Sequence, residues 1–242
     1  MKIAIVSYFA PPQPAVASHR VLRLTRALLS AGHVVHWVTL DPRRLDESDA
    51  TLAAVTPREV VVHGLGGVNL VDRAARNVAE KIVRTVIFKL PELWPVFDRH
   101  LEWTRRLKRN LPAIVRKEAF DVVLLCCGPH GQMKVVPTLR RLFPALRIVI
   151  DYRDLLTGNT WRQSKSERLR RMLRQKERRI LAQADLLCLN SADARASFES
   201  TMGAIDGLRI ELMRNTADYE LRHARGGSAR RSGGGACARR AT

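Results

Sequence analysis

Short apolar runs alternate along this chain with longer segments whose apolar residues recur every three or four positions. Residues 3–6 form an uninterrupted apolar run, and the apolar residues between positions 21 and 31 share one helical face, with arginines on the other. Uninterrupted runs are typical of strands that helices cover on both faces of a parallel sheet. We therefore predict a strand, a loop, a helix with Ser18 as its N-cap, and a second strand at residues 34–38.

The same alternation continues to about residue 213. Further strands are predicted at residues 59–63, 120–127, 147–151, 185–190 and 208–213. Helices are predicted at residues 70–90, at 132–142, at 166–184 and after Ser191, and a further basic helix is predicted to end at about Lys117. Residues 41–56 are predicted to be irregular. Strands and helices that alternate in this way predict an α/β fold with a doubly wound, Rossmann-like parallel sheet.

A helical insertion interrupts this alternation at about residues 70–118. Trp94 and Phe97 belong to an apolar knot that is flanked by charged residues. One interpretation is a helical hairpin that packs on the sheet. The other is a surface at residues 90–103 that enters an anionic membrane, because lipid charge attracts basic helices and aromatic rings favour the interface.

The last residues differ in character from the rest. We predict that residues 1–218 form one domain and that residues 219–242 form a disordered tail rich in Arg, Gly and Ala. The tail has almost no large apolar residue and neither a helical nor a strand period, which is typical of disorder. It is either a linker or a non-native end, such as one produced by a shifted reading frame.

Composition adds a strong positive charge to this picture. The chain has 242 residues, 46% of them hydrophobic, and a formal net charge of +19. That content suffices for a packed core, and the lack of a long apolar run predicts no transmembrane helix. The last 21 residues hold six arginines and no acid, so the first 221 still carry +13. Nucleic acid, anionic lipid and phosphorylated small molecules all fit such a surface.

The four cysteines form neither a disulfide nor a metal pattern. Cys126 and Cys127 are adjacent in a predicted strand, Cys188 lies in another, and Cys237 is in the tail. The chain has no CxxC pair and no His/Cys cluster of ligand spacing. We therefore expect reduced core cysteines in a cytosolic protein, and no metal site.

Candidate chemistry gathers in the loops that follow three predicted strands. These loops hold Ser7, Tyr8, His19 and Arg20 after the first strand, His130 after residues 120–127, and Arg153 and Asp154 after residues 147–151. The carboxyl ends of parallel strands meet at one edge of a sheet, so we expect these side chains to lie close together. Arginine binds phosphate, and Asp or His accepts a hydroxyl proton, so the edge suits a phosphate- or sugar-bearing ligand.

Taken singly, these residues also have structural interpretations. His19 would cap the helix, His130 would be a turn residue, and Arg153 with Asp154 would form a local ion pair. Other site motifs are missing from the sequence: it has no GxGxxG after the first strand, no GxxxxGK[ST] and no GxSxG. Their absence argues against a dehydrogenase, an NTPase or an α/β-hydrolase.

Several segments together resemble a known family. KIAIVSYFAPP with ASHRVLRLTRALLSAGHVVHWVT, then CCGPHGQMKVVPTLRR, IVIDYRDLLTG and RRILAQADLLCLNSADARASF, resemble the amino-terminal domain of family 4 glycosyltransferases of the GT-B fold. The fragment LRIELMRNTADYE is similar to the point at which such enzymes cross into their second domain. The resemblance covers residues 1–218 and indicates a chain truncated before the donor-binding domain.

The resemblance implies a retaining hexosyltransferase-like enzyme of cell-envelope polysaccharide biosynthesis. Its amino-terminal domain would hold a glycan or lipid-linked acceptor, with a nucleotide-sugar as co-substrate and no cofactor or essential metal. By position, His130 would line the reacting-sugar region as the catalytic candidate, and residues 7–20 would flank the cleft. Arg153 and Asp154 would shape its floor. We expect a cytoplasmic protein, peripheral on the inner face of the plasma membrane.

The sequence departs from the family pattern in two places. Pro14 to Ala17 replace the Gly-Gly often found in the first loop, and no two glutamates have the E-x7-E spacing of the donor domain. We therefore expect the chain to be inactive alone. Two alternatives remain open: the acceptor-side subunit of a split transferase that docks a donor-binding partner, and a basic nucleic-acid-binding module. The few aromatic residues are not interleaved with the basic ones, so we expect no specific nucleic acid.

Overall fold

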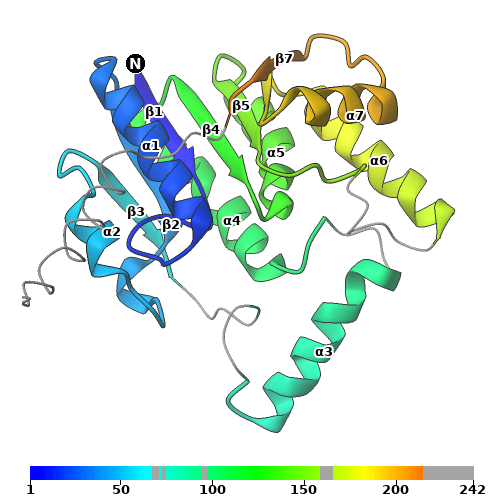
Figure 1. The fold of residues 1–242 in the computed structure, drawn as a ribbon, viewed down its shortest axis with the longest axis horizontal. Helices are drawn as coiled ribbons and strands as arrows, with labels where there is room; N and C mark the ends of the chain where they lie inside the picture. Colours follow the sequence, from blue (N-terminus) through cyan, green and yellow to red (C-terminus); the bar gives the residue numbers. More distant parts are fainter. Residues whose placement is uncertain (67–70, 72–74, 94–96, 159–165, 215–242) are drawn as a thin grey trace, which may run out of the picture.

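The computed structural model describes residues 1–66, 71, 75–93, 97–158 and 166–214 (Figure 1). The predicted tail at residues 219–242 and the side chain of Trp94 lie outside these residues.

The described residues form a seven-stranded parallel sheet of order β3-β2-β1-β4-β5-β6-β7, which confirms the predicted α/β fold (Figure 1). The order reverses between β1 and β4, where the chain leaves one half of the sheet and starts the other. The strands are β1 (Lys2–Val6), β2 (Val34–Leu40), β3 (Val61–Leu65), β4 (Val122–Cys127), β5 (Arg147–Tyr152), β6 (Leu186–Leu189) and β7 (Arg209–Leu212).

Alternate residues along the central strands face two separate apolar layers. On one face, Ile5, Trp37 and Leu124 pack with Val21 of helix α1 (Val16–Ser30). The opposite face packs against other helices and forms the larger core. These helices are α4 (Leu101–Glu118), the 3-10 helix η2 (His130–Val135), α5 (Val136–Leu142), α6 (Glu167–Leu181) and α7 (Ala192–Met202).

Helix α1 begins earlier than predicted. Its N-cap is Ala15, which makes no side-chain cap hydrogen bond, whereas Ser18 is buried in the first turn. The backbone N–H of Ser18 already donates to the Ala15 carbonyl at 2.9 Å. The prediction of Ser18 as the cap was wrong because the helix follows Pro14 directly and starts without a polar cap.

The segment predicted to be irregular contains two short helices. Asp41 precedes the 3-10 helix η1 (Pro42–Arg44), and Asp49 caps α2 (Ala50–Ala54). The Asp49 carboxylate accepts hydrogen bonds from the backbone N–H groups of Thr51 and Leu52. Helices this short show no apolar period, so the sequence pattern could not reveal them.

The predicted insertion consists of two helices with different surroundings. Helix α4 buries Trp103, Leu107 and Leu111 against the sheet. Helix α3 (Val78–Leu93) instead lies apart from the sheet (Figure 1). The predicted packing on the sheet is therefore correct for α4, whereas the described residues of α3 do not pack on the sheet.

Candidate functional site

The carboxyl ends of β1, β4 and β5 lie side by side in the sheet, as the sequence predicted. Val6 of β1 is paired with Leu125 of β4, and Cys127 of β4 with Tyr152 of β5. The loops that follow these strands therefore emerge at the same edge, next to the point where the strand order reverses. In open α/β sheets, ligands usually bind at the carboxyl edge beside such a reversal of strand order.

An ion pair fixes the start of α1 to β5 beneath this edge. The guanidinium of Arg20 donates from Nε and from one terminal nitrogen to the two carboxylate oxygens of Asp151, both at 2.6 Å. It also donates to the Met213 carbonyl at 3.0 Å. Burial alone would lower the pKa of Arg20, but the hydrogen bonds and the charge of Asp151 outweigh burial and raise it. Arg20 thus holds three segments together.

Ser7 and Tyr8 point into the protein. The Ser7 hydroxyl donates to the Phe9 carbonyl at 2.6 Å, and the Tyr8 ring makes edge contacts with His100 and Trp103. Both side chains are buried. In this structure they shape the first loop from within, and their predicted contact with a substrate stays a prediction.

His130 joins two of the candidate loops. Its Nε2 lies 2.7 Å from the backbone carbonyl of Asp154, and its ring packs edge-on against Tyr152. Because a carbonyl only accepts, Nε2 carries a proton in this arrangement. His130 is 1% exposed. The structure therefore brings the His130 ring to the backbone of the Asp154 loop, and the predicted roles of both side chains stay predictions.

The more accessible candidate groups are Arg153, Asp154 and His19. Arg153 Nε lies 3.4 Å from a carboxylate oxygen of Asp154, and the two side chains are 34% and 47% exposed. The Asn190 amide donates to the Arg153 carbonyl at 2.6 Å and so ties this loop to β6. His19 is partly exposed in the first turn of α1. A ligand at this edge would meet these side chains first.

A scan against protein-family models matches residues 17–221 to Glycosyltransferase Family 4. The chain belongs to this glycosyltransferase family. The matched range contains nearly all of α1, the His130 loop and the Arg153 loop, so the family resemblance seen in the sequence is confirmed. A search of curated proteins found no match.

Solved glycosyltransferase structures share the fold of this family 4 chain. The sucrose-phosphate synthase from Thermosynechococcus elongatus has a TM-score of 0.59 at 18% identity, covering 94% of this chain and 52% of that one. UGT2 of Phytolacca americana, complexed with UDP-2fluoro-glucose and pterostilbene, has a TM-score of 0.53 at 11% identity, with coverages of 93% and 57%. A trehalose-6-phosphate structure from E. coli bound with UDP-2-fluoro glucose has a TM-score of 0.51 at 9% identity, with coverages of 94% and 54%.

The chain spans about half the length of these three proteins. At such identities the likeness shows the GT-B type of fold alone. It agrees with the sequence resemblance to one half of a GT-B enzyme.

Three hydrogen bonds that support the His130 loop could not be predicted from the sequence. Gln132 donates to the Cys126 carbonyl at 2.6 Å and accepts from the Trp103 indole at 3.1 Å. Asp98 accepts a hydrogen bond from the backbone N–H of Gly131. Asp98 and Trp103 belong to the predicted insertion, and nothing in their sequence pattern links them to a loop about thirty residues later.

A buried carboxyl group lies behind the same loop of the glycosyltransferase domain. Glu177 of α6 accepts a hydrogen bond from the Tyr152 hydroxyl at 2.9 Å, and that hydroxyl also lies 3.0 Å from the Met133 sulfur. Burial raises the pKa of Glu177 to about 8, although the bonds to Tyr152 and the Thr157 backbone act in the opposite direction. Glu177 therefore sits protonated at neutral pH, under the ring that His130 contacts.

Proposed function

We propose that this chain is the acceptor-binding half of a retaining glycosyltransferase. The reaction would transfer a sugar from a nucleotide-sugar to a polysaccharide or lipid-linked glycan of the cell envelope. The observation that supports it best is the meeting of His130, Arg153 and Asp154 at the carboxyl edge of a family 4 domain. The UDP-2fluoro-glucose bound by UGT2 of Phytolacca americana supports a nucleotide-sugar as the donor class.

The proposed site would bind the acceptor through the exposed pair Arg153 and Asp154, with the buried His130 behind them. Asp154 would accept hydrogen bonds from sugar hydroxyls, and Arg153 would attract a phosphate or orient an acidic group. His130 would line the reacting-sugar region, with its ring orientation fixed by the Asp154 carbonyl. In the transfer, the acceptor oxygen would form a bond to the anomeric carbon, the nucleoside diphosphate would leave with the bonding electrons, and the hydroxyl proton would pass to the departing diphosphate.

We further propose that a second domain or a partner chain binds most of the nucleotide-sugar and that no cofactor or essential metal takes part. The leaving diphosphate needs donors that stabilise its developing charge. The E-x7-E spacing associated with the donor domain does not occur in this sequence. The purified chain should therefore bind acceptor without transferring sugar.

This prediction is tested with a glycan array and a turnover assay. The full chain should bind one class of glycan, and Arg153→Gln should weaken that binding about tenfold because a charge-assisted hydrogen bond is lost. Arg209→Gln is the matched control, since Arg209 forms an ion pair with Glu211 at the same 3.4 Å distance on β7. No release of nucleoside diphosphate should be measured. Turnover by the chain alone, or equal losses in the two variants, would contradict the proposal.

We also propose peripheral binding to an anionic membrane on its cytoplasmic side, through α3. The aromatic residues Phe97 and Trp103 of the predicted anchor at residues 90–103 are only 3% and 2% exposed. They are therefore buried in the protein and do not support this segment as the membrane contact. Helix α3 instead exposes Val78, Ile82 and Val86 at 74%, 60% and 56%. Among the described residues, no helix combines the length and apolar character needed to span a bilayer.

Changing Ile82 and Val86 to serine should weaken binding to phosphatidylserine vesicles about tenfold, because each residue contributes apolar contact with the lipid. Sedimentation with vesicles measures the effect. Met172→Ser is the control, because Met172 is an exposed apolar residue at 38% on α6. If the double variant and the control sediment alike, α3 is not the membrane contact.

A further inference from the structure

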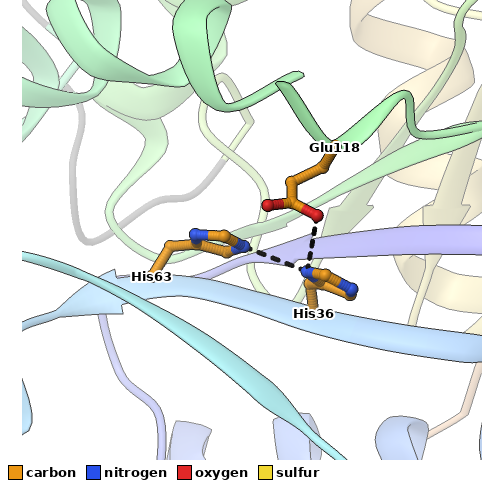
Figure 2. Close-up of side chains that lie close together, drawn as sticks. All are labelled: His36, His63 and Glu118. Atoms are coloured by element: carbon orange, nitrogen blue, oxygen red, sulfur yellow. Dashed lines mark hydrogen bonds and ion pairs between the residues drawn. The ribbon is translucent and has the colours of Figure 1, made fainter. Parts of the chain in front are cut away.

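A second polar cluster lies at the opposite end of the strands from the proposed acceptor site. His36 of β2 and His63 of β3 face the last turn of α4, where Glu118 ends the helix (Figure 2). The register pairs His36 with Val61 and His63 with Val38, so the histidines occupy the same sheet face, offset by two positions. Strand pairing thus brings together two histidines that are 27 residues apart.

The three side chains aim their ligand atoms at one point. His36 Nδ1 lies 3.0 Å from His63 Nε2 and 3.9 Å from Glu118 Oε2 (Figure 2). All three atoms lie within 4.8 Å of one another. In a tetrahedral zinc site with bonds of about 2.0–2.1 Å, ligand atoms are about 3.3 Å apart. To place all three around one ion, the 3.9 Å separation would have to shorten by about 0.6 Å and the widest separation by up to about 1.5 Å, which side-chain rotation can supply.

The surroundings keep both rings neutral and in place. His36 is 4% exposed, and the Phe120 ring makes edge contacts with both imidazoles. Burial lowers the pKa of His36 and of His63, and the nearby Lys2 ammonium adds to this effect. A neutral imidazole offers a lone pair to a metal, whereas an imidazolium does not.

We propose that His36, His63 and Glu118 bind a divalent transition-metal ion, with zinc the best match. Two imidazoles and one carboxylate are ligands that zinc accepts, and water would complete the coordination. The proton now shared between His36 Nδ1 and His63 Nε2 would move through solvent to the other nitrogen of the ring that carries it. The ion would then replace this hydrogen bond with two metal–nitrogen bonds.

Lys2 competes for the same carboxylate in the structure. Its Nζ lies 2.6 Å from Glu118 Oε2, and the two side chains are 30% and 16% exposed. A bound dication would repel this ammonium, which can swing into solvent because its side chain is partly exposed already. Removing the lysine charge should therefore tighten metal binding, although it removes an ion pair.

The ion would fasten the edge strand to the body of the domain. Strand β3 has only one buried residue, Leu65, and its remaining residues are exposed or partly buried. Coordination would link β2, β3 and the end of α4 at one point. No metal site was predicted from the sequence, because these ligands lie far apart along the chain and no cysteine takes part.

Calorimetric titration of the full chain with zinc chloride at pH 7.5 tests the proposal. We expect one zinc per chain and a thermal midpoint raised by about 5 °C at a large excess of zinc over the dissociation constant. His63→Gln, at the more exposed of the two histidines, should weaken binding at least tenfold. Lys2→Gln should bind zinc several-fold more tightly than the unaltered chain. His33→Gln, a histidine outside the cluster, is the matched control and should change neither value.

Cobalt substitution separates this site from Cys237 of the tail. Cobalt bound to nitrogen and oxygen ligands gives d–d absorption bands without the thiolate charge-transfer band that a cysteine ligand produces. A thiolate band, unaltered zinc affinity in His63→Gln, or weaker binding in Lys2→Gln would each overturn the proposal. Sugar transfer plays no part in these measurements, so they stand apart from the proposed function.

Discussion

Replacing Arg20 with methionine should lower the free energy of unfolding by about 3–5 kcal/mol, because the change leaves the Asp151 carboxylate buried without its partner. Asp151 is 1% exposed, and both of its oxygens accept hydrogen bonds from Arg20 at 2.6 Å. Methionine retains most of the apolar volume of the arginine side chain, so the loss reports mainly on the charge. Guanidinium chloride denaturation followed by tryptophan fluorescence measures it.

Arg23→Met is the matched control for this prediction. Arg23 lies one turn further along α1, and its bond to the Arg214 carbonyl is exposed and 3.5 Å long. Its replacement should cost less than about 1 kcal/mol. The double variant Arg20→Met with Asp151→Asn should recover part of the loss, since no uncompensated charge remains. Equal losses in Arg20→Met and Arg23→Met would show that the ion pair does not hold α1 to β5.

This ion pair also changes what the sequence suggested for Arg20. The sequence made Arg20 a candidate for substrate binding because it lies in the first loop region and carries a positive charge. In the structure its guanidinium is engaged by Asp151 and by the Met213 carbonyl. Of the two candidate arginines, Arg153 is the accessible one, at 34% exposed. We therefore expect Arg20 to support the site and Arg153 to meet the ligand.

The apolar pattern predicted most of the fold because it reports directly on burial. Central strands such as β1 and β4 are covered on both faces, so their sequences are uninterrupted apolar runs. The same pattern placed three loops at one edge, and the strand order confirms this. It failed where no period exists, as in the five-residue helix α2.

Contacts between distant residues could not be read from the pattern. Arg20 and Asp151 are 131 residues apart, and His130 meets the Asp154 carbonyl from another loop. Tyr8 was a candidate for contact with a ligand, yet it is 2% exposed and packs against Trp103 of α4. An apolar period indicates that a residue is buried on one face of its element. It does not indicate which residue of another element it contacts.

Because of Glu177, the free energy of unfolding should fall as the pH rises from about 5 to 8. Burial raises the pKa of this carboxyl from 4.5 to about 8 in the folded chain. Below pH 4.5 the group is protonated in the folded and the unfolded chain, so it does not make the free energy of unfolding depend on pH. Between the two values the unfolded chain loses the proton while the folded chain keeps it, and folding becomes less favourable with each step in pH. Above pH 8 the folded chain holds a buried charge.

Glu177→Gln should remove this dependence and stabilise the chain by about 2–4 kcal/mol at pH 9, since one pKa unit corresponds to about 1.4 kcal/mol and relaxation around the charge reduces the full value. A glutamine oxygen can still accept the Tyr152 hydroxyl proton, so the effect at pH 5 should be small. Denaturation curves at pH 5, 7 and 9 measure the difference between the variant and the unaltered chain. Glu199→Gln, at a carboxylate that is 48% exposed on α7, should give parallel curves throughout. If Glu177→Gln were less stable than the unaltered chain at pH 9, the buried carboxyl would instead be a net stabilising charge that its neighbours Tyr152 and Arg174 sustain.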